Sequence, residues 1–394
     1  MEPCRREEKQ ATIDNLPLGL DMKEVPANGY LVENLWNHPN QLSEEMVCCM
    51  RDIFLFLADP SKTSSEHIAS PCSPQGHLSY SSLTSFLDSP ALTSLGRSPS
   101  LETDHDSEII IRDTLSDPYK VPGKLEWTKS IGPYSAAVEV AWFSVGKKEL
   151  EYAAIALKRF RMLVEQLASV NPSCMSCNEK LAFWINLYNA LIMHGYLAYG
   201  VPKSDMKLFS LMQKAAYTIG GQSLSAAYIE YIILKMKPPA HRPQIAVILA
   251  LQKFKISEEQ KQYSIDHPEP LLSFALSCGM HSSPAVRIFR PENVSDLLKS
   301  SLQDYVQASV GISDKGKLLV PKLLYCFAKG VVDESMVPAW ISQYLSPEQA
   351  AIVRTCSAAH KWKLLGARSF SVLPFDTRFR FLFLREGKSP SSPA

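Results

Sequence analysis

The sequence predicts an α+β fold that is dominated by helices and completed by a small sheet. Residues 178–200 form a nearly uninterrupted apolar run, which predicts a helix buried on all sides. Residues 149–170 carry apolar side chains at helical spacing, with charged residues largely on the opposite face. Short apolar pieces at 271–277 and 286–289, bounded by Gly or Pro, predict strands.

The composition is that of a globular protein with room for a full core. The chain has 394 residues, of which 46% are hydrophobic and 21% charged. Its 41 basic and 40 acidic residues give a net charge of +1. General nucleic-acid binding is therefore not expected, because it needs a concentrated basic face.

The start of the chain is charged and is followed by no apolar stretch, so the sequence predicts no signal peptide. The most apolar part of the central run spans Leu181 to Met193, which is shorter than the ~20 residues that cross a membrane. We therefore expect a protein of the cytoplasm or the nucleus without a transmembrane segment. Its nine cysteines are expected to be reduced thiols.

The N-terminal region, residues 1–58, contains one predicted helix at about 42–58, with Ser43 as the expected N-cap. Residues 59–121 contain four Ser-Pro dipeptides and few apolar runs, which predicts a disordered linker. Phosphorylation at these sites would make the linker regulatory, whereas a solvated spacer is the plainer interpretation.

A globular domain is expected at 122–384, followed by a disordered tail at 385–394. Beyond the elements named above, this domain is expected to contain a hairpin around 217–221, helices at 226–237, 293–308 and 335–355, an extended piece at 317–320 that leads into a helical turn at Pro321, and strands at 369–373 and 378–384.

Two amides interrupt the apolar run. Asn186 and Asn189 are the only strongly polar residues between 181 and 193, and their spacing places them on one helix face. A buried amide without partners costs roughly 1–3 kcal/mol, so we expect both to bind the turn at 278–284. They are either structural or one wall of a ligand pocket. In the second case, three further residues are expected at the pocket mouth: Ser282, Ser283 and Arg287.

The candidates for catalysis are few. Cys278 ends the predicted strand at 271–277, and His281 follows three residues later as a candidate base. Glu230 and His194 are candidate acid–base groups on predicted helices. A structural role is the plainer interpretation of each of these side chains, since buried free cysteines are common and inert.

No cofactor or metal is expected. Cys174 and Cys177 form one C-x-x-C pair, whereas a structural zinc site needs four ligands. The sequence contains no G-x-S-x-G, no P-loop and no G-x-G-x-x-G motif.

Three segments carry a family resemblance: EKLAFWINLYNAL at 179–191, FALSCG at 274–279 and SSP at 282–284. They resemble the domain of unknown function 547 family, with similarity over about 138–344. The flanking segments resemble its plant branch, in a form that lacks the N-terminal leucine zipper of ternary-complex-factor type. The resemblance implies no assigned activity.

Some bacterial relatives resemble this chain but carry His at the position of Ser273 and Cys at that of Ser283. If that pair is catalytic there, the resemblance implies that this chain has lost it. A distant similarity to transglutaminase- or papain-like folds has the same implication, because Asn186 and Ser273 poorly replace a Cys–His pair.

Two hypotheses follow. The first is a non-enzymatic interaction or regulatory protein with protein partners. The alternative is a cysteine-dependent hydrolase or acyltransferase that uses Cys278.

Overall fold

The computed structural model describes residues 34–58, 117–125, 131–141, 147–238, 248, 257–361 and 370–384. The chain divides into two units, 1–33 and 34–394, and every described residue belongs to the second. The predicted linker up to residue 116 and the predicted tail at 385–394 lie outside the described residues.

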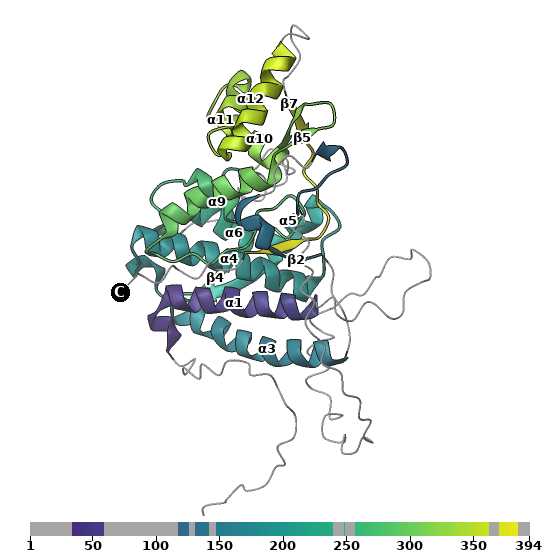
Figure 1. Cartoon of the computed structure of the whole chain (residues 1–394). Helices are drawn as coiled ribbons and strands as arrows, with labels where there is room; N and C mark the ends of the chain where they lie inside the picture. The colour runs from purple at the N-terminus through teal and green to yellow at the C-terminus, as the bar shows by residue number, and fades with distance from the viewer. Residues whose placement is uncertain are drawn as a thin grey trace, which may run out of the picture. The chain divides into compact units, whose positions relative to one another are not determined.

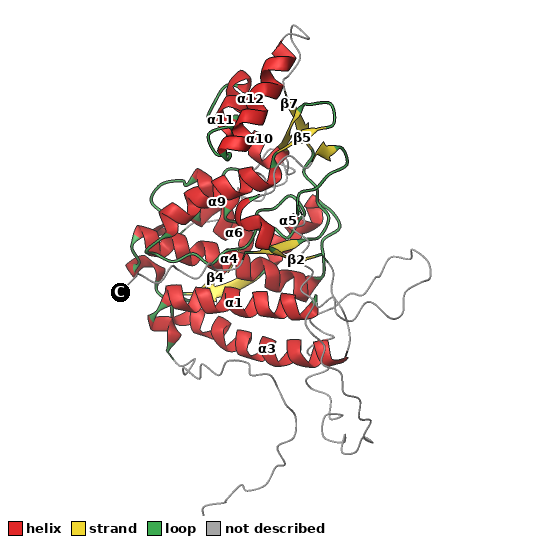
Figure 2. Cartoon of the chain, in the orientation of Figure 1, coloured by secondary structure: helices red, strands yellow, loops and turns green. Residues whose placement is uncertain are grey.

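The fold is α+β and mainly helical, as predicted (Figure 2). The longer helices are α1 (Pro39–Leu57), α3 (Lys147–Gln166), α4 (Cys177–Tyr199), α5 (Asp205–Lys214), α9 (Val294–Ser309) and α12 (Pro347–Lys361). Shorter helices are α6 (Ala226–Tyr228), α8 (Glu258–Tyr263), α10 (Lys322–Ala328) and α11 (Val337–Ile341). Short 3₁₀ turns and one π-turn, Ile229–Ile233, connect them.

The strands form three small sheets among the described residues. The largest has the order β1-β5-β6-β7, in which β6 and β7 run parallel with Leu318 opposite Phe370. The strands of this sheet are β1 (Lys124–Leu125), β5 (Gly311–Ser313), β6 (Leu318–Pro321) and β7 (Phe370–Leu373). The two-stranded sheets pair β2 (Val138–Val140) with β8 (Phe381–Phe383), and β3 (Ala216–Ile219) with β4 (Gln222–Ser225).

Helix α4 is the centre of the fold. It packs against α1, α5, α6 and α9, and α1 and α3 lie side by side next to it (Figure 1). Ser176 and Glu179 form a capping box at its start, with the Glu179 carboxylate accepting from the Ser176 N–H at 2.7 Å. A Cβ at Gly195 would lie 2.9 Å from Leu211 of α5, so the two helices approach closely only because this residue is glycine.

A second apolar core lies between α9, the four-stranded sheet and the C-terminal helices. Phe274 and Tyr305 contribute aromatic rings to it, and Trp340 is buried among them. This core therefore joins the segment after residue 270 to the C-terminal part of the domain.

The N-cap predicted for α1 is wrong. The helix begins at Pro39, and its N-cap is His38, five positions before Ser43. Proline suits the first helical position because its φ is already helical and its missing N–H would have no helical partner. Ser43 lies inside the helix, buried, and its hydroxyl donates to the Asn40 carbonyl at 2.7 Å.

The strand predicted at 271–277 is wrong. Pro270–Phe274 form a 3₁₀ helix, and the Glu269 carboxylate caps it by accepting from the Leu271 N–H at 2.9 Å. The strand predicted at 286–289 is also wrong, since it makes only an isolated bridge between Val286 and Phe383. A short apolar run does not distinguish a strand from another buried conformation.

Two predicted helices differ in length. The helix predicted at 226–237 ends in a π-turn at Ile233 and is followed by Lys235 at φ 51°. The helix predicted at 335–355 is divided, because a turn at 342–346 separates α11 from α12.

The folded chain begins before the predicted boundary at residue 122. Tyr119, assigned to the linker, is only 6% exposed and packs on Tyr134 and Tyr305. Asp117 pairs with the buried Lys124 ammonium at 2.8 Å. Residues 117–121 therefore belong to the packed structure, while the domain division as a whole stays a prediction.

Trp184→Ala is expected to lower the free energy of unfolding by about 3–5 kcal/mol, because it removes a large side chain from the core. Trp184 is 0% exposed, and its indole N–H donates to the Tyr263 carbonyl at 3.0 Å. Chemical denaturation of the full chain measures the loss. Tyr199→Ala, at the 56% exposed end of the same helix, is the matched control and should change stability little. An unchanged melting temperature for Trp184→Ala would contradict this account of the core.

Candidate functional site

Asn186 and Asn189 bind the backbone of the segment 275–289. Asn189 donates to the Ala275 carbonyl at 3.1 Å and accepts from the Ser277 N–H at 2.9 Å. Asn186 donates to the Phe289 carbonyl at 2.8 Å and accepts from the Phe289 N–H at 2.9 Å. Both side chains are fully buried. Each amide thus supplies one donor and one acceptor, as a neighbouring strand would.

Tyr196 extends this polar stripe along the same face of α4. Its hydroxyl donates to the Cys278 carbonyl at 2.7 Å. The asparagines therefore bind the two ends of the segment, and Tyr196 binds the turn between them. Gly279, at φ 71°, lets the turn approach, because a Cβ there would lie 2.7 Å from Phe381 and 2.8 Å from Tyr196.

Remote parts of the chain hold the turn from other directions. The Ser282 hydroxyl accepts from the Asp376 N–H at 2.8 Å, and the Tyr305 hydroxyl donates to the Ser282 carbonyl at 3.0 Å. The Tyr119 hydroxyl donates to the Ser283 carbonyl at 2.7 Å. Ser282 thus serves as an anchor of the turn.

Arg380 of the C-terminal region is a buried cation that crosslinks these segments. Its side chain is 1% exposed and donates to the carbonyl oxygens of Pro118 and His281. The guanidinium also lies 4.7 Å from the centre of the Tyr119 ring and 3.8 Å from the Glu139 carboxylate. A buried charge needs such partners to offset its lost hydration.

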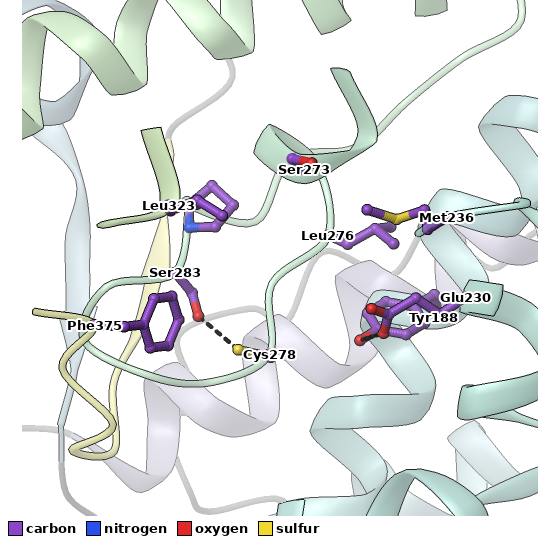
Figure 3. Close-up of a pocket in the computed structure, with 10 residues that line it drawn as sticks. Tyr188, Glu230, Met236, Ser273, Leu276, Cys278, Ser283, Leu323 and Phe375 are labelled. Carbon is purple, nitrogen blue, oxygen red and sulfur yellow. Dashed lines mark hydrogen bonds between the residues drawn. The ribbon is translucent and has the colours of Figure 1, made fainter. Parts of the chain in front are cut away.

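A small pocket opens beside the turn (Figure 3). One side carries the Tyr188 hydroxyl, which donates to the buried Glu230 carboxylate at 2.7 Å. The other carries the Cys278 thiol, 3.0 Å from the Ser283 hydroxyl. The remaining lining residues are Met236, Ser273, Leu276, Pro284, Leu323 and Phe375.

The size of the pocket restricts what it can hold. Its free volume is ≈ 40 Å³. That is room for a few water molecules or a small chemical group. Pockets for drug-sized ligands are roughly 300–1,000 Å³. As it stands, the pocket fits the end of a side chain or a molecule of a few atoms.

Cys278 and His281 do not form a catalytic pair in this structure. The Cys278 thiol is hydrogen-bonded to the Ser283 hydroxyl, which also accepts a hydrogen bond from the Met280 N–H at 3.2 Å. The His281 ring lies against Asp376, with Nδ1 at 3.7 Å from a carboxylate oxygen. Burial, followed by the nearby Arg380, lowers the pKa of His281 to about 4. Among the described residues, no hydrogen bond joins the thiol to this imidazole.

The remaining predicted residues are distributed differently. Glu230 and Ser283 line the pocket together with Cys278, while Arg287 pairs with Asp304 of α9. His194 lies elsewhere on α4, where its Nδ1 is 3.0 Å from the Tyr217 hydroxyl and burial lowers its pKa to about 4.

Two functional candidates were missed from the sequence. Tyr188 lies beside Asn189 in the apolar run, and a buried phenol there also requires a polar partner. Arg380 is the one cation within residues 379–384, between Arg378 and Arg385, and a cation enclosed by apolar residues indicates a buried charge with specific acceptors.

The C-x-x-C pair is not poised for a disulfide. Met175 (φ −84°, ψ 142°) and Ser176 (φ −65°, ψ 168°) are extended between Cys174 and Cys177. Three extended steps separate the two Cα atoms by ~9 Å, whereas a disulfide allows less than ~7 Å. In the ranges that the structure describes, no group of three or more His, Cys, Asp or Glu side chains could hold a metal ion.

A family model described as "Protein of unknown function, DUF547" matches residues 172–306. This range is shorter than the expected 138–344, but it contains α4 and the whole segment 275–289. No curated protein and no solved structure matches the chain. No helix in the described ranges has the length and apolar character needed to cross a membrane.

Asn189→Leu is expected to lower the free energy of unfolding by roughly 1–3 kcal/mol, although leucine is more apolar. The substitution leaves the Ala275 carbonyl and the Ser277 N–H without their partner in the core. Asn178→Leu is the matched control, because Asn178 is exposed in the first turn of the same helix. Urea denaturation of the two variants measures the difference, and equal stability would refute the bridging role of Asn189.

Acid is expected to destabilise the protein through His281, whose side chain is only 20% exposed. Its pKa falls from 6.5 to about 4 on folding. Below pH 6.5 the unfolded chain therefore binds a proton that the folded chain accepts only near pH 4, and stability declines over this window. The expected loss from His281 between about pH 7 and pH 5 is roughly 1–2 kcal/mol.

His281→Asn should reduce this loss, with His194 supplying the remainder. The exposed His38→Gln is the control for removal of a histidine side chain. Denaturant midpoints measured across the pH range test the assignment, which fails if His281→Asn retains the full wild-type slope.

Proposed function

Starting from the match of residues 172–306 to the DUF547 family model, we propose that the protein is a non-enzymatic interaction or regulatory protein. Its binding site in this proposal is the pocket between α4 and the turn at 278–284. Protein partners insert a side chain or a small group there.

The observation that carries the proposal is that each candidate catalytic group already has a hydrogen-bond or ion-pair partner in the turn or the pocket wall. The Cys278 thiol is hydrogen-bonded to the Ser283 hydroxyl, His281 lies against Asp376, and the Glu230 carboxylate accepts a hydrogen bond from Tyr188. A nucleophile needs a base within hydrogen-bond reach, and that base needs a group to orient it. These side chains instead stabilise the turn and the pocket walls.

The family resemblance supports the same proposal. By this resemblance, some bacterial relatives carry His at the position of Ser273 and Cys at the position of Ser283. Both residues line this pocket. Two serines offer hydrogen bonds to a ligand but no thiolate and no imidazole base, so the pocket retains polarity suited to binding.

The pocket walls suit a ligand with an apolar body. Met236, Leu276, Leu323 and Phe375 supply apolar surface, and the polar groups lie at two separate places. Ligand sites commonly combine mostly apolar walls with a few polar groups that fix orientation.

A cysteine-dependent hydrolase or acyltransferase is the second candidate. It is favoured by one observation, that the Cys278 thiol itself lines the pocket beside a hydroxyl. In that case a base for Cys278 would have to approach from a different arrangement of the chain or from a partner.

Thiol alkylation distinguishes the two candidates. Iodoacetamide labelling of the full chain, quantified at each cysteine by mass spectrometry across a pH series, is expected to be slower at Cys278 than at Cys174 and Cys177. Cys278 is 5% exposed, whereas the other two are exposed and serve as internal controls. Faster labelling at Cys278 than at Cys174 near neutral pH would favour the nucleophile.

A designed variant tests the pocket from the opposite direction. Ser273→His combined with Ser283→Cys should create a thiol that is alkylated faster than the thiol of Ser283→Cys alone, since imidazole promotes thiolate formation. Equal alkylation rates in the double and single variants would count against the idea that this pocket corresponds to a catalytic site that has lost a His and a Cys.

A further inference from the structure

Three apolar side chains project into solvent where α4 ends and α5 begins. Tyr199, Val201 and Met206 are 56%, 36% and 54% exposed. They lie within eight positions of one another in the sequence, around the turn that follows Gly200. Their proximity distinguishes them from single exposed apolar residues, which are common on protein surfaces.

Lysines accompany these apolar residues. Lys203 is exposed in the turn, and Lys207 and Lys214 are exposed on α5, where their seven-residue spacing gives them one face. In the part of the chain that the structure describes, no carboxylate pairs with any of the three. The one acid between Tyr199 and Lys214 is Asp205, which is half-buried.

The packing of α5 fixes this arrangement. Leu208, Phe209, Leu211 and Met212 are buried on its inner face, so Met206, Lys207 and Lys214 must point outward. Ser204 caps the helix by accepting from the Lys207 N–H at 3.3 Å. The patch is therefore part of a defined helix and turn, which lowers the entropy lost when it binds.

We propose that the α4–α5 corner, formed by Tyr199, Val201, Lys203, Met206, Lys207 and Lys214, docks on an anionic membrane surface. Tyrosine and lysine are suited to the lipid–water interface, where an aromatic ring lies at the headgroups and an ammonium meets phosphate. Val201 and Met206 would enter the boundary between headgroups and acyl chains. Such docking is peripheral and independent of the pocket.

A second exposed apolar pair on the same chain has two acids between its members and the exposed Lys329 two positions before it. Val331 and Met336 are 55% and 53% exposed, and Asp333 and Glu334 lie between them. The exposed fractions of the apolar side chains are thus similar at the α4–α5 corner and at Val331 and Met336, while lysines surround the first and acids separate the second pair. An anionic surface should select the lysine-bearing corner and reject the acidic one, which makes Val331 and Met336 a control within the molecule.

The test is flotation of the full chain with vesicles of phosphatidylcholine alone or with phosphatidylserine. Binding is expected only with phosphatidylserine and should weaken with added salt. Each lysine near an anionic surface contributes about fivefold in affinity, so Lys203→Ala, Lys207→Ala and Lys214→Ala together should weaken binding by roughly 100-fold. Tyr199→Ser with Met206→Ser should also weaken it, whereas Val331→Ser with Met336→Ser should not.

Circular dichroism verifies that the variants remain folded, which is expected because every changed side chain is exposed. The proposal is overturned if the wild type ignores phosphatidylserine, or if the two apolar double variants lose binding equally. It is also overturned if the lysine variant changes the oligomeric mass in solution without changing vesicle binding. In that event the corner is an interface between copies of the chain.

Discussion

The two amides in the middle of α4 constrain everything around the pocket. Asn186 and Asn189 lie on a helix with no access to water, so their hydrogen-bonding capacity must be met by other parts of the protein. Backbone groups between 275 and 289 meet most of it, and the Ser43 hydroxyl of α1 accepts from Asn186 at 3.3 Å. In return, the segment 275–289 gains a donor and an acceptor at each end. Its middle pairs with residues of the C-terminal region, where the Val286 N–H donates to the Leu382 carbonyl at 2.7 Å. The irregular path of the chain beside α4 is therefore a direct consequence of where the amides lie.

The opposite side of the turn depends on the buried Arg380. Its guanidinium joins Pro118 and the adjacent Tyr119 ring to His281, which is distant from both in the sequence. The turn is consequently held between neutral amides on α4 and a cation from the C-terminal region. We call the contacts from α4 on one side of the turn and from Arg380 on the other the clamp. Because a buried cation without acceptors is very costly, the Arg380 half of the clamp holds the His281 carbonyl of the turn firmly in place.

This clamp explains the character of the pocket. The Cys278 thiol and the Ser283 hydroxyl enter the pocket from a turn whose backbone is bonded on both sides. Such a rigid arrangement favours recognition of a small group of fixed shape. The α4–α5 corner lies at the C-terminal end of the same helix. Helix α4 thus joins the pocket that we propose binds partners to the corner that we propose docks on membranes.

The sequence by itself determined the parts of this protein that depend on local pattern. The apolar run predicts α4, amphipathic spacing predicts α3 and α9, and glycines predict the β3–β4 hairpin. It also predicted that Asn186 and Asn189 require buried partners, because that follows from the chemistry of an amide in an apolar helix. The prediction that both bind the turn at 278–284 was wrong, since they bind Ala275, Ser277 and Phe289 on either side of it.

The tertiary structure decided which groups those partners are. The apolar residues 271–277 suit a strand as well as a 3₁₀ helix, and the choice was made by hydrogen bonds to α4 across more than eighty positions of sequence. The pairing of Cys278 with Ser283 rather than His281, and the burial of Arg380 beneath Tyr119, likewise depend on contacts between distant segments. Periodicity and composition report on neighbours along the chain, so they carry no information about such contacts.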